Sequence, residues 1–222
     1  NSSDYLEVAT TRPETLFGDT AVAVNPEFDY NIVKIKSSER NVIVCSNVMK
    51  VLKDDVVEVI KTVKGSELVG LTYETCFPEL SEQQFEHKIV AWEDVDAEEG
   101  TGVVHIAPGC GAEDNELGKR LGLPEIMPVD DMGIFLKGFG FFTGKNSKTI
   151  ADEVFEELKK RDKLYLIKPH EHSYPVCWRC KEELIYRLVP SWFIKTEELK
   201  PRLIKNAMSV KWEPESNGKR ML

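Results

Sequence analysis

The pattern that most constrains the fold is a series of short apolar or alternating segments, each no longer than five residues and separated by turn-forming residues. In the first 110 residues this pattern predicts strands at residues 5–9, 20–24, 32–36, 41–44, 56–60, 88–91 and 103–107. Many short strands with few helices between them are typical of a closed or strongly coiled mixed sheet rather than a doubly wound parallel one. The predicted fold class is therefore α+β, a mixed β-barrel-like core of short strands with peripheral helices.

Two later segments have the pattern of amphipathic helices. Residues 112–121 place acidic residues early and basic residues late, which complements the helix dipole, and Gly122 ends the pattern. A second helix is expected at residues 148–161, with Asn146 or Ser147 as its cap. Its apolar stripe consists of Ile150, Val154, Phe155 and Leu158.

The net charge of −9 is unevenly distributed along the 222 residues. Residues 151–222 hold 15 Lys and Arg against 12 Asp and Glu, so residues 1–150 carry −12. A domain that grips many phosphates is expected to be basic, so any RNA partner would be contacted only at its end. With a cysteine motif beyond residue 170, the charge change predicts two domains, residues 1–168 and 169–222.

No sequence feature predicts a membrane protein. No apolar run approaches the ~18–20 residues that span a bilayer, and the N-terminus has no secretory signal pattern. The chain begins at Asn1 without a Met, which predicts a segment of a longer protein. Its odd number of scattered cysteines does not form a disulfide framework, so a reducing cytosol is the expected location.

Cys177 and Cys180 have the spacing of half a tetrahedral zinc site. His172 is a weak candidate for a third ligand because it stands five residues before the first cysteine. Either the pair consists of free thiols, or its partner ligands lie outside this chain. We favour the second interpretation.

A hydroxyl-rich turn at residues 9–15 contains Thr10, Thr11, Arg12 and Thr15. Threonine hydroxyls donate and accept hydrogen bonds, so they can orient a water or a sugar hydroxyl, and Arg12 can contact a phosphate or a carboxylate. A strand end rich in β-branched residues, closed by a proline turn, is an equally good interpretation of this segment alone.

The strand at residues 103–107 ends in a second candidate region, which contains His105. Its flanking glycines at 100, 102, 109 and 111 weaken a strand, so they indicate turns or close backbone approach. His105 can then line a pocket, donate a hydrogen bond or exclude larger side chains. A half-buried histidine with satisfied hydrogen bonds is the default alternative.

Glu113 and Asp114 stand at the start of the first predicted helix, where acidic residues ordinarily complement the helix dipole. One of them can instead pair with a substrate ammonium. No order of Ser, His and Asp suited to nucleophilic catalysis accompanies them. The two regions together indicate hydrolysis by positioning a water and an ester rather than by covalent attack.

These motifs resemble class I aminoacyl-tRNA synthetases that activate branched aliphatic amino acids, and the resemblance covers nearly the whole chain. In that family an inserted editing (CP1) domain hydrolyses wrongly charged tRNA. The resemblance implies that Asp114 holds the α-ammonium of the misplaced amino acid, and that Thr10, Thr11 and His105 complete the catalytic set. The substrate-binding residues that it implies are Arg12, Thr15, Asp19 and Gly109.

Two parts of the sequence disagree on whether the chain is more similar to the isoleucyl or to the valyl members of this family. Arg12, Glu14 and Asp19 resemble valyl enzymes, since isoleucyl enzymes usually carry threonine, tryptophan and asparagine at these places. His105 and the long segment at residues 172–193 resemble isoleucyl enzymes. The longer match is harder to reach by chance, so the chain most resembles the editing domain of isoleucyl-tRNA synthetases, with an unusual first motif.

The resemblance implies hydrolysis of the ester in valyl-tRNA(Ile) and a cytoplasmic location. The expected partners are the aminoacylated 3′ end of tRNA and the rest of the synthetase, with the chain itself a monomer. The resemblance also implies no cofactor in this segment, whereas the parent enzyme uses ATP and completes a zinc site with Cys177 and Cys180. Residues 169–222 would then be strands that return to the nucleotide-binding domain of that enzyme and carry half of a zinc-ribbon-like site. Two alternatives stay open: a valyl editing domain acting on threonyl-tRNA(Val), and a non-catalytic module that binds the tRNA 3′ end.

Overall fold

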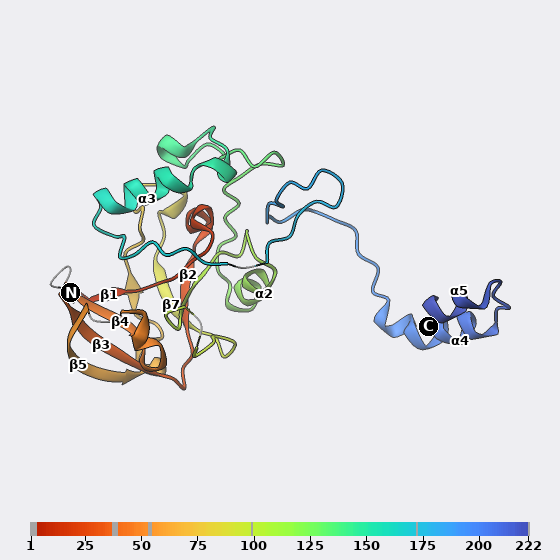
Figure 1. The fold of residues 1–222 in the computed structure, drawn as a ribbon, viewed down its shortest axis with the longest axis horizontal. Helices are drawn as coiled ribbons and strands as arrows, with labels where there is room; N and C mark the ends of the chain where they lie inside the picture. Colours follow the sequence, from red (N-terminus) through yellow and green to blue (C-terminus); the bar gives the residue numbers. More distant parts are fainter. Residues whose placement is uncertain (1–3, 37–39, 53–54, 99, 172, 222) are drawn as a thin grey trace. The chain divides into compact units, whose positions relative to one another are not determined.

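A computed structural model describes residues 4–36, 40–52, 55–98, 100–171 and 173–221. The chain divides into two compact units, Asn1–Leu188 and Val189–Leu222. Figure 1 shows both sheets and the helices α2 and α3 in the first unit, and α4 next to α5 in the second. The predicted domain boundary at residue 168 stays a prediction.

The first sheet has the strand order β1-β4-β3-β5. Its strands are β1 (Asp4–Leu6), β3 (Asp29–Ile35), β4 (Asn41–Cys45) and β5 (Val56–Lys64). The predicted hairpin of the segments around residues 32–36 and 41–44 is confirmed, because β3 pairs antiparallel with β4. β1 joins the other side of β4 in parallel, which places the start of the hydroxyl-rich turn beside this sheet.

The second sheet has the order β6-β7-β2-β8. Its strands are β2 (Ala21–Val24), β6 (Thr72–Tyr73), β7 (His87–Ala91) and β8 (Val103–Ile106). All four residues of β2 are buried, because β7 flanks it in parallel and β8 antiparallel. The α+β class is confirmed, with the described strands divided between two mixed four-stranded sheets, neither of which closes into a barrel.

Both predicted helices form. α2 (Ala112–Leu121) has the predicted ends, and Gly122 terminates it with a left-handed φ of 68°. The second predicted helix is a 3-10 turn, η6 (Ser147–Thr149), followed by α3 (Ala151–Lys160). The Asn146 side chain caps this pair by accepting a hydrogen bond from the Lys148 backbone N–H. Three residues of the predicted stripe are buried: Ile150, Val154 and Leu158.

A cluster of aromatic rings fixes the 3-10 helix η1 (Pro13–Gly18), which contains the end of the hydroxyl-rich turn. Phe17 is completely buried at its centre, with its ring centroid 4.4 Å from that of Phe142 and 5.0 Å from that of Phe77. Removing such a buried ring typically costs ~3–5 kcal/mol. The first motif therefore stands on a rigid base.

The remaining short elements of the first unit lie in the connections between these strands and helices. They are η2 (Ser46–Val51), α1 (Gly65–Leu68), η4 (Ser81–Gln83) and η5 (Gly140–Phe142). The second unit contains η7 (Glu197–Leu199), α4 (Lys200–Ser209) and α5 (Glu215–Met221), which sequence analysis did not predict. Within the described residues, no helix has both the length and the apolar character needed to cross a membrane.

Candidate active site

The hydroxyl-rich turn is held by hydrogen bonds within itself. The Thr10 hydroxyl accepts a hydrogen bond from the Arg12 backbone N–H at 3.0 Å, and the Thr15 backbone N–H donates to the Arg12 carbonyl at 3.0 Å. Pro13 occupies the first turn of η1, where its fixed φ favours the helix and its missing N–H costs nothing. Thr10 is half-buried, whereas Thr11 is exposed.

A side-chain contact joins the two motifs, which are 90 residues apart in sequence. The Thr15 Oγ1 lies 3.0 Å from Nε2 of His105. This contact is possible because β2 follows η1 directly and pairs with β8, where Val22 lies opposite His105. Burial lowers the pKa of His105 to about 4, so its imidazole is neutral at physiological pH.

Asp19 also lies at the junction of the two motifs, which is the region formed by η1, β2, β8 and the start of α2. Its Oδ1 accepts a hydrogen bond from the Ile106 backbone N–H at 3.2 Å, and the neighbouring Thr20 N–H donates to the Ile106 carbonyl at 2.8 Å. Its carboxyl is buried, and burial raises its pKa well above the usual value despite these backbone hydrogen bonds. These contacts explain Asp19 as a residue that ties the motifs together, and its predicted substrate contact is not tested by them.

Asp114 turns back from α2 to the end of β8. Its Oδ2 accepts a hydrogen bond from the Ala107 backbone N–H at 2.9 Å, while the adjacent Glu113 is exposed. Burial, the largest effect, raises the pKa of the Asp114 carboxyl, and the Ala107 N–H opposes it. The choice of Asp114 over Glu113 thus corresponds to a difference in position: only Asp114 is directed to the His105 strand.

The predicted close backbone approach occurs at Gly109. A Cβ atom there would lie 1.9 Å from the Ile126 carbonyl oxygen, so only glycine fits. Gly102 has a positive φ of 68° and packs its α-carbon against Cys45. These glycines therefore shape the chain around β8. Gly109 affects the site by allowing this close packing of two backbone segments. Its predicted contact with a substrate stays a prediction.

A pocket of about 250 Å³ opens beside the first motif. Thr11, Arg12 and Thr15 line one side of it. The other predicted residues, Thr10, Asp19, His105, Gly109 and Asp114, do not line it. Sequence analysis missed several lining side chains: Glu14, Cys110, Lys148, Tyr174, Ile185 and Tyr186. Burial raises the pKa of the Cys110 thiol to about 12, so this thiol is not an activated nucleophile.

Arg12 points toward the far wall of this pocket. Its guanidinium carbon lies 4.5 Å from the ring centroid of Tyr186 and 5.4 Å from that of Tyr174, and its Nε donates to Glu14 at 3.0 Å. The planar cation stacks on aromatic faces in a way that threonine cannot. The unusual residue of the first motif therefore connects that motif to residues 173–188, which we name the cysteine segment.

The cysteine segment folds back on itself around its two thiols. Val176 and Glu183 form an antiparallel bridge, and the Lys181 N–H donates to the Cys177 carbonyl at 2.9 Å. Backbone N–H groups of Cys180 and Arg179 lower the pKa of the Cys177 thiol. His172 lies outside the described residues, and the described residues contain no group of three or more His, Cys, Asp or Glu side chains placed to hold a metal.

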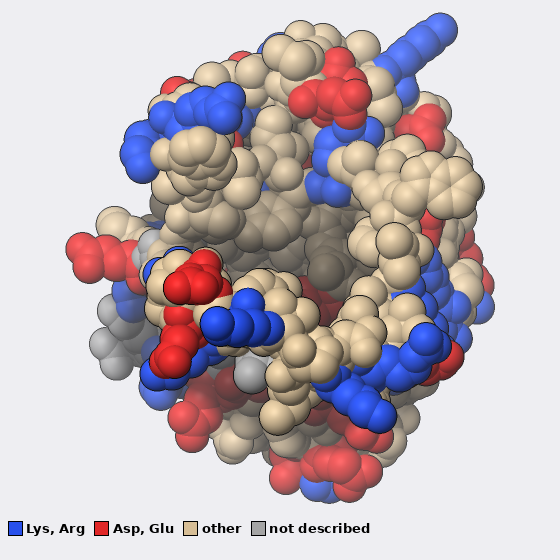
Figure 2. Space-filling view, turned by 90° about the vertical axis from the view of Figure 1, so that its right-hand side faces the viewer, with Lys and Arg blue, Asp and Glu red and all other residues tan. Residues whose placement is uncertain are grey.

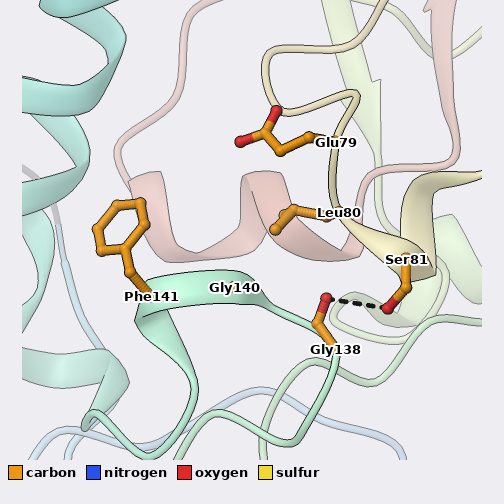
Figure 3. A pocket seen from close by; sticks show the side chains of 6 residues that line it. All are labelled: Glu79, Leu80, Ser81, Gly138, Gly140 and Phe141. Carbon is orange, nitrogen blue, oxygen red and sulfur yellow. Dashed lines mark hydrogen bonds between the residues drawn. The ribbon is translucent and has the colours of Figure 1, made fainter.

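A second hollow, of about 390 Å³, has no residue of either motif in its lining. Figure 3 shows Glu79, Leu80 and Ser81 on one segment facing Gly138 and Phe141 on another, and the Ser81 hydroxyl donates to the Gly138 carbonyl at 3.2 Å. Glu79 is paired with Arg161 at 2.6 Å. With its one carboxylate already paired and no predicted residue in its lining, this hollow offers no comparable chemistry.

Figure 2 shows one face of the protein, on which Lys and Arg side chains occur together with Asp and Glu and with many uncharged residues.

Comparison with known proteins identifies the family. The profile of a family described as tRNA synthetases class I (I, L, M and V) matches residues 18–222. The chain belongs to this family. It is similar to the isoleucine–tRNA ligase of Methanothermobacter marburgensis, with 38% identity over 216 residues, which cover 96% of this chain and 20% of that protein. The isoleucine–tRNA ligase of Bdellovibrio bacteriovorus is 39% identical over 211 residues, with 93% and 20% covered.

The chain thus spans about a fifth of the length of the curated relatives it matches. Among solved structures, the crystal structure of GlLeuRS-CP1 superposes with a TM-score of 0.60 at 18% identity, covering 77% of this chain and 86% of the other. At this level of identity the likeness concerns the fold. The two proteins thus share a fold over most of this chain.

Proposed function

We propose that this chain is the editing domain of an isoleucyl-tRNA synthetase and hydrolyses the ester bond of valyl-tRNA(Ile). The observation that carries the proposal is the junction of the two motifs, in which Thr15 contacts His105 and Asp114 is bound to the end of the same strand. The similarity to isoleucine–tRNA ligases and the fold shared with GlLeuRS-CP1 support it.

The geometry suggests a division of work within the site. Asp114 has one carboxylate oxygen bound to the Ala107 N–H, which leaves the other for the α-ammonium of the amino acid. Thr10 and Thr11 orient the attacking water, and His105 lies against the side chain of the bound amino acid and rejects isoleucine. Water attacks the ester carbonyl, the bond to the ribose oxygen breaks, and the proton passes to that oxygen. No covalent intermediate is required, since the nearby Cys110 thiol is not activated.

Such an activity answers a physical limit on selection. One methylene in an apolar pocket is worth only ~1–3 kcal/mol, or about 10–200-fold, and isoleucyl enzymes facing valine are themselves the usual example of this limit. An enzyme that accepts isoleucine must therefore admit some valine. A second pocket that excludes isoleucine by size can remove the error.

The proposal assigns the remaining properties to the parent enzyme. The partners are the aminoacylated 3′ end of tRNA and the rest of the synthetase, which supplies most of the tRNA affinity and uses ATP in the cytoplasm. The chain itself needs no cofactor and is a monomer. The Cys177–Cys180 turn fits half of a structural zinc site, because its N–H groups favour the thiolate that zinc binds. Zinc held there with ligands from elsewhere would stiffen the cysteine segment.

The decisive test is to give the purified chain valyl-tRNA(Ile) and threonyl-tRNA(Val) in parallel assays. Deacylation is measured as the release of the labelled amino acid. We expect preferential release of valine. Asp114→Ala should abolish most of it, whereas Glu113→Ala, a neighbouring exposed carboxylate, should retain it. Preferential release of threonine would assign the chain to valyl enzymes. Binding of the tRNA end without release of either amino acid would favour the non-catalytic module, and near-normal activity of Asp114→Ala would overturn the residue assignment.

A further inference from the structure

The hydroxyl of Thr15 has two neighbours within hydrogen-bond distance and one proton to share between them. Its Oγ1 lies 2.8 Å from the Arg12 carbonyl oxygen and 3.0 Å from Nε2 of His105. The carbonyl oxygen can only accept a hydrogen bond, whereas each imidazole nitrogen donates or accepts according to the tautomer. The proton count of this pair therefore determines the state of the ring.

The threonine proton must point to the carbonyl. If it pointed to His105 instead, two oxygen atoms without a proton between them would face each other at 2.8 Å. With its proton directed to Arg12, the Thr15 oxygen can only accept from the ring, so Nε2 of His105 must carry a proton. The imidazole is neutral because burial depresses its pKa, and Nδ1 therefore carries a lone pair.

That lone pair has no partner within the described part of the chain. Nδ1 of His105 is buried, and no hydrogen-bond donor of the described residues reaches it. A buried acceptor that nothing satisfies is uncommon in folded proteins and frequently marks a functional group. The other ring nitrogen is fully accounted for by Thr15, so the two sides of the ring differ in chemistry.

We propose that Thr15 is a positioning residue that holds His105 in its Nε2-protonated tautomer, so that Nδ1 serves as a hydrogen-bond acceptor for an O–H group of the bound substrate. The identity of that O–H group rests on the proposed function, under which it belongs to the terminal ribose or to the attacking water. Since Nδ1 is buried, that group reaches it only when the atoms that cover it move aside on binding. The tautomer itself does not rest on it. Thr15 then acts through His105 and makes no contact with the reacting atoms.

Nitrogen-15 NMR of the histidine rings tests the tautomer directly. The chain has four histidines, and His105→Gln identifies the resonances of the ring in question. In the wild-type chain we expect Nε2 to carry the proton and Nδ1 to be bare. Thr15→Ser keeps the hydroxyl and should preserve this pattern, whereas Thr15→Val removes the acceptor and should shift the ring toward the other tautomer or a mixture.

Thr149→Val is a matched control. The Thr149 hydroxyl also donates to the carbonyl three residues earlier, Asn146, at 3.1 Å, but Thr149 is exposed and makes no hydrogen bond to a histidine among the described residues. It should leave the His105 resonances unchanged. A proton on Nδ1 in the wild-type chain would overturn the proposal, and so would an unchanged tautomer in a Thr15→Val chain whose other resonances stay native.

Deacylation separates this proposal from the proposed function. Thr15→Val should lower kcat at least about tenfold with little change in KM, since a histidine in the wrong tautomer cannot take its hydrogen bond. Thr15→Ser should restore kcat to near the wild-type value. A wild-type chain that deacylates nothing but has the predicted tautomer would refute the proposed function alone, whereas equal kcat for Thr15→Ser and Thr15→Val would refute the role of Thr15.

Discussion

The junction of the two motifs and the cysteine segment are built in opposite ways. The junction, formed by η1, β2, β8 and the start of α2, is held by buried strands, by an aromatic cluster and by glycines that admit no Cβ atom. The cysteine segment carries the longest isoleucyl-like match, yet none of its residues, all of which are described, is buried. The junction therefore combines the family's sequence motifs with a buried structure, whereas the cysteine segment carries the family's sequence pattern without buried residues.

The contacts of the cysteine segment explain this difference. It is attached through the Arg12 contacts with its tyrosines, an ion pair between Arg187 and Asp131, and a hydrogen bond from the Leu188 N–H to the Gly109 carbonyl at 3.3 Å. Trp178 is 76% exposed, although a segment with no further contacts to make would not need so large an apolar side chain on its surface. The segment is therefore a wall of the pocket that keeps much of its own surface exposed.

The largest expected effect is at the junction. Gly109→Ala would force a Cβ atom to within 1.9 Å of the Ile126 carbonyl, and backbone cannot yield cheaply, so we expect a loss of ~3 kcal/mol or more in the free energy of unfolding. Gly111→Ala is the matched control, since its Cβ would meet Asp114 at 3.2 Å and its φ is −135°. Urea denaturation of both variants measures the difference. Equal stability would show that the junction is more adaptable than its packing indicates.

Sequence reasoning predicted local elements better than their neighbours. α2 was placed with its true ends because its charges follow the dipole and Gly122 stops it. The parallel pairing of β2 with β7, by contrast, joins residues 21 and 88, and no local pattern specifies it. The helices α4 and α5 were missed because residues beyond 170 were interpreted only as strands returning to a larger domain.

The candidate site divides along the same line. Thr10, Thr11, His105 and Asp114 were found from residue type and the family motif, and their catalytic roles stay predictions. The contact of Thr15 with His105 spans 90 residues and depends on how β2 and β8 pair, so spacing could not reveal it. Likewise, nothing local indicates that Tyr174 and Tyr186 face Arg12.

A second prediction concerns pH and the segment between β1 and the first motif. Burial raises the pKa of Glu7 to about 7, above its model-compound value of 4.5. The folded state then binds more protons than the unfolded state between these values, so this group's contribution to stability is present at low pH and lost as pH rises through about 7. Glu7→Gln removes the loss and should be ~3 kcal/mol more stable relative to wild type at pH 8 than at pH 4.5.

Urea denaturation of the wild-type chain and Glu7→Gln at several pH values measures that difference. A constant gap between the two chains from pH 4.5 to 8 would mean that the pKa of Glu7 does not change on folding. The segment that enters the first motif would then leave this carboxyl as well solvated as in the unfolded chain, and the contrast with the exposed cysteine segment would be weaker.

A third prediction concerns the substrate preference of the junction. Under the proposed function, His105→Ala should leave more room for the side chain of the bound amino acid and allow isoleucyl-tRNA(Ile) to be hydrolysed, reducing the preference for valyl-tRNA(Ile) by about 10–200-fold, the range for one methylene. The double variant with Asp114→Ala should hydrolyse neither, which would show that both esters use one site. Full discrimination by His105→Ala would mean that other side chains set the size limit.

The smallest effect is expected at the link between the two regions. Each Arg12–tyrosine contact is worth ~0.5–1 kcal/mol at a partly exposed site, so Arg12→Ala should free the cysteine segment while changing the unfolding free energy of the whole unit by no more than about 1–2 kcal/mol. Hydrogen exchange at the Leu188 amide, which donates to Gly109, reports the release locally and should accelerate. Arg12→Lys keeps the charge but loses the planar group, so its exchange rate at the Leu188 amide should lie between those of the wild-type chain and Arg12→Ala. If Arg12→Ala destabilised the unit as much as Gly109→Ala, the cysteine segment would be part of the core, and the distinction between a rigid junction and an appended wall would fail.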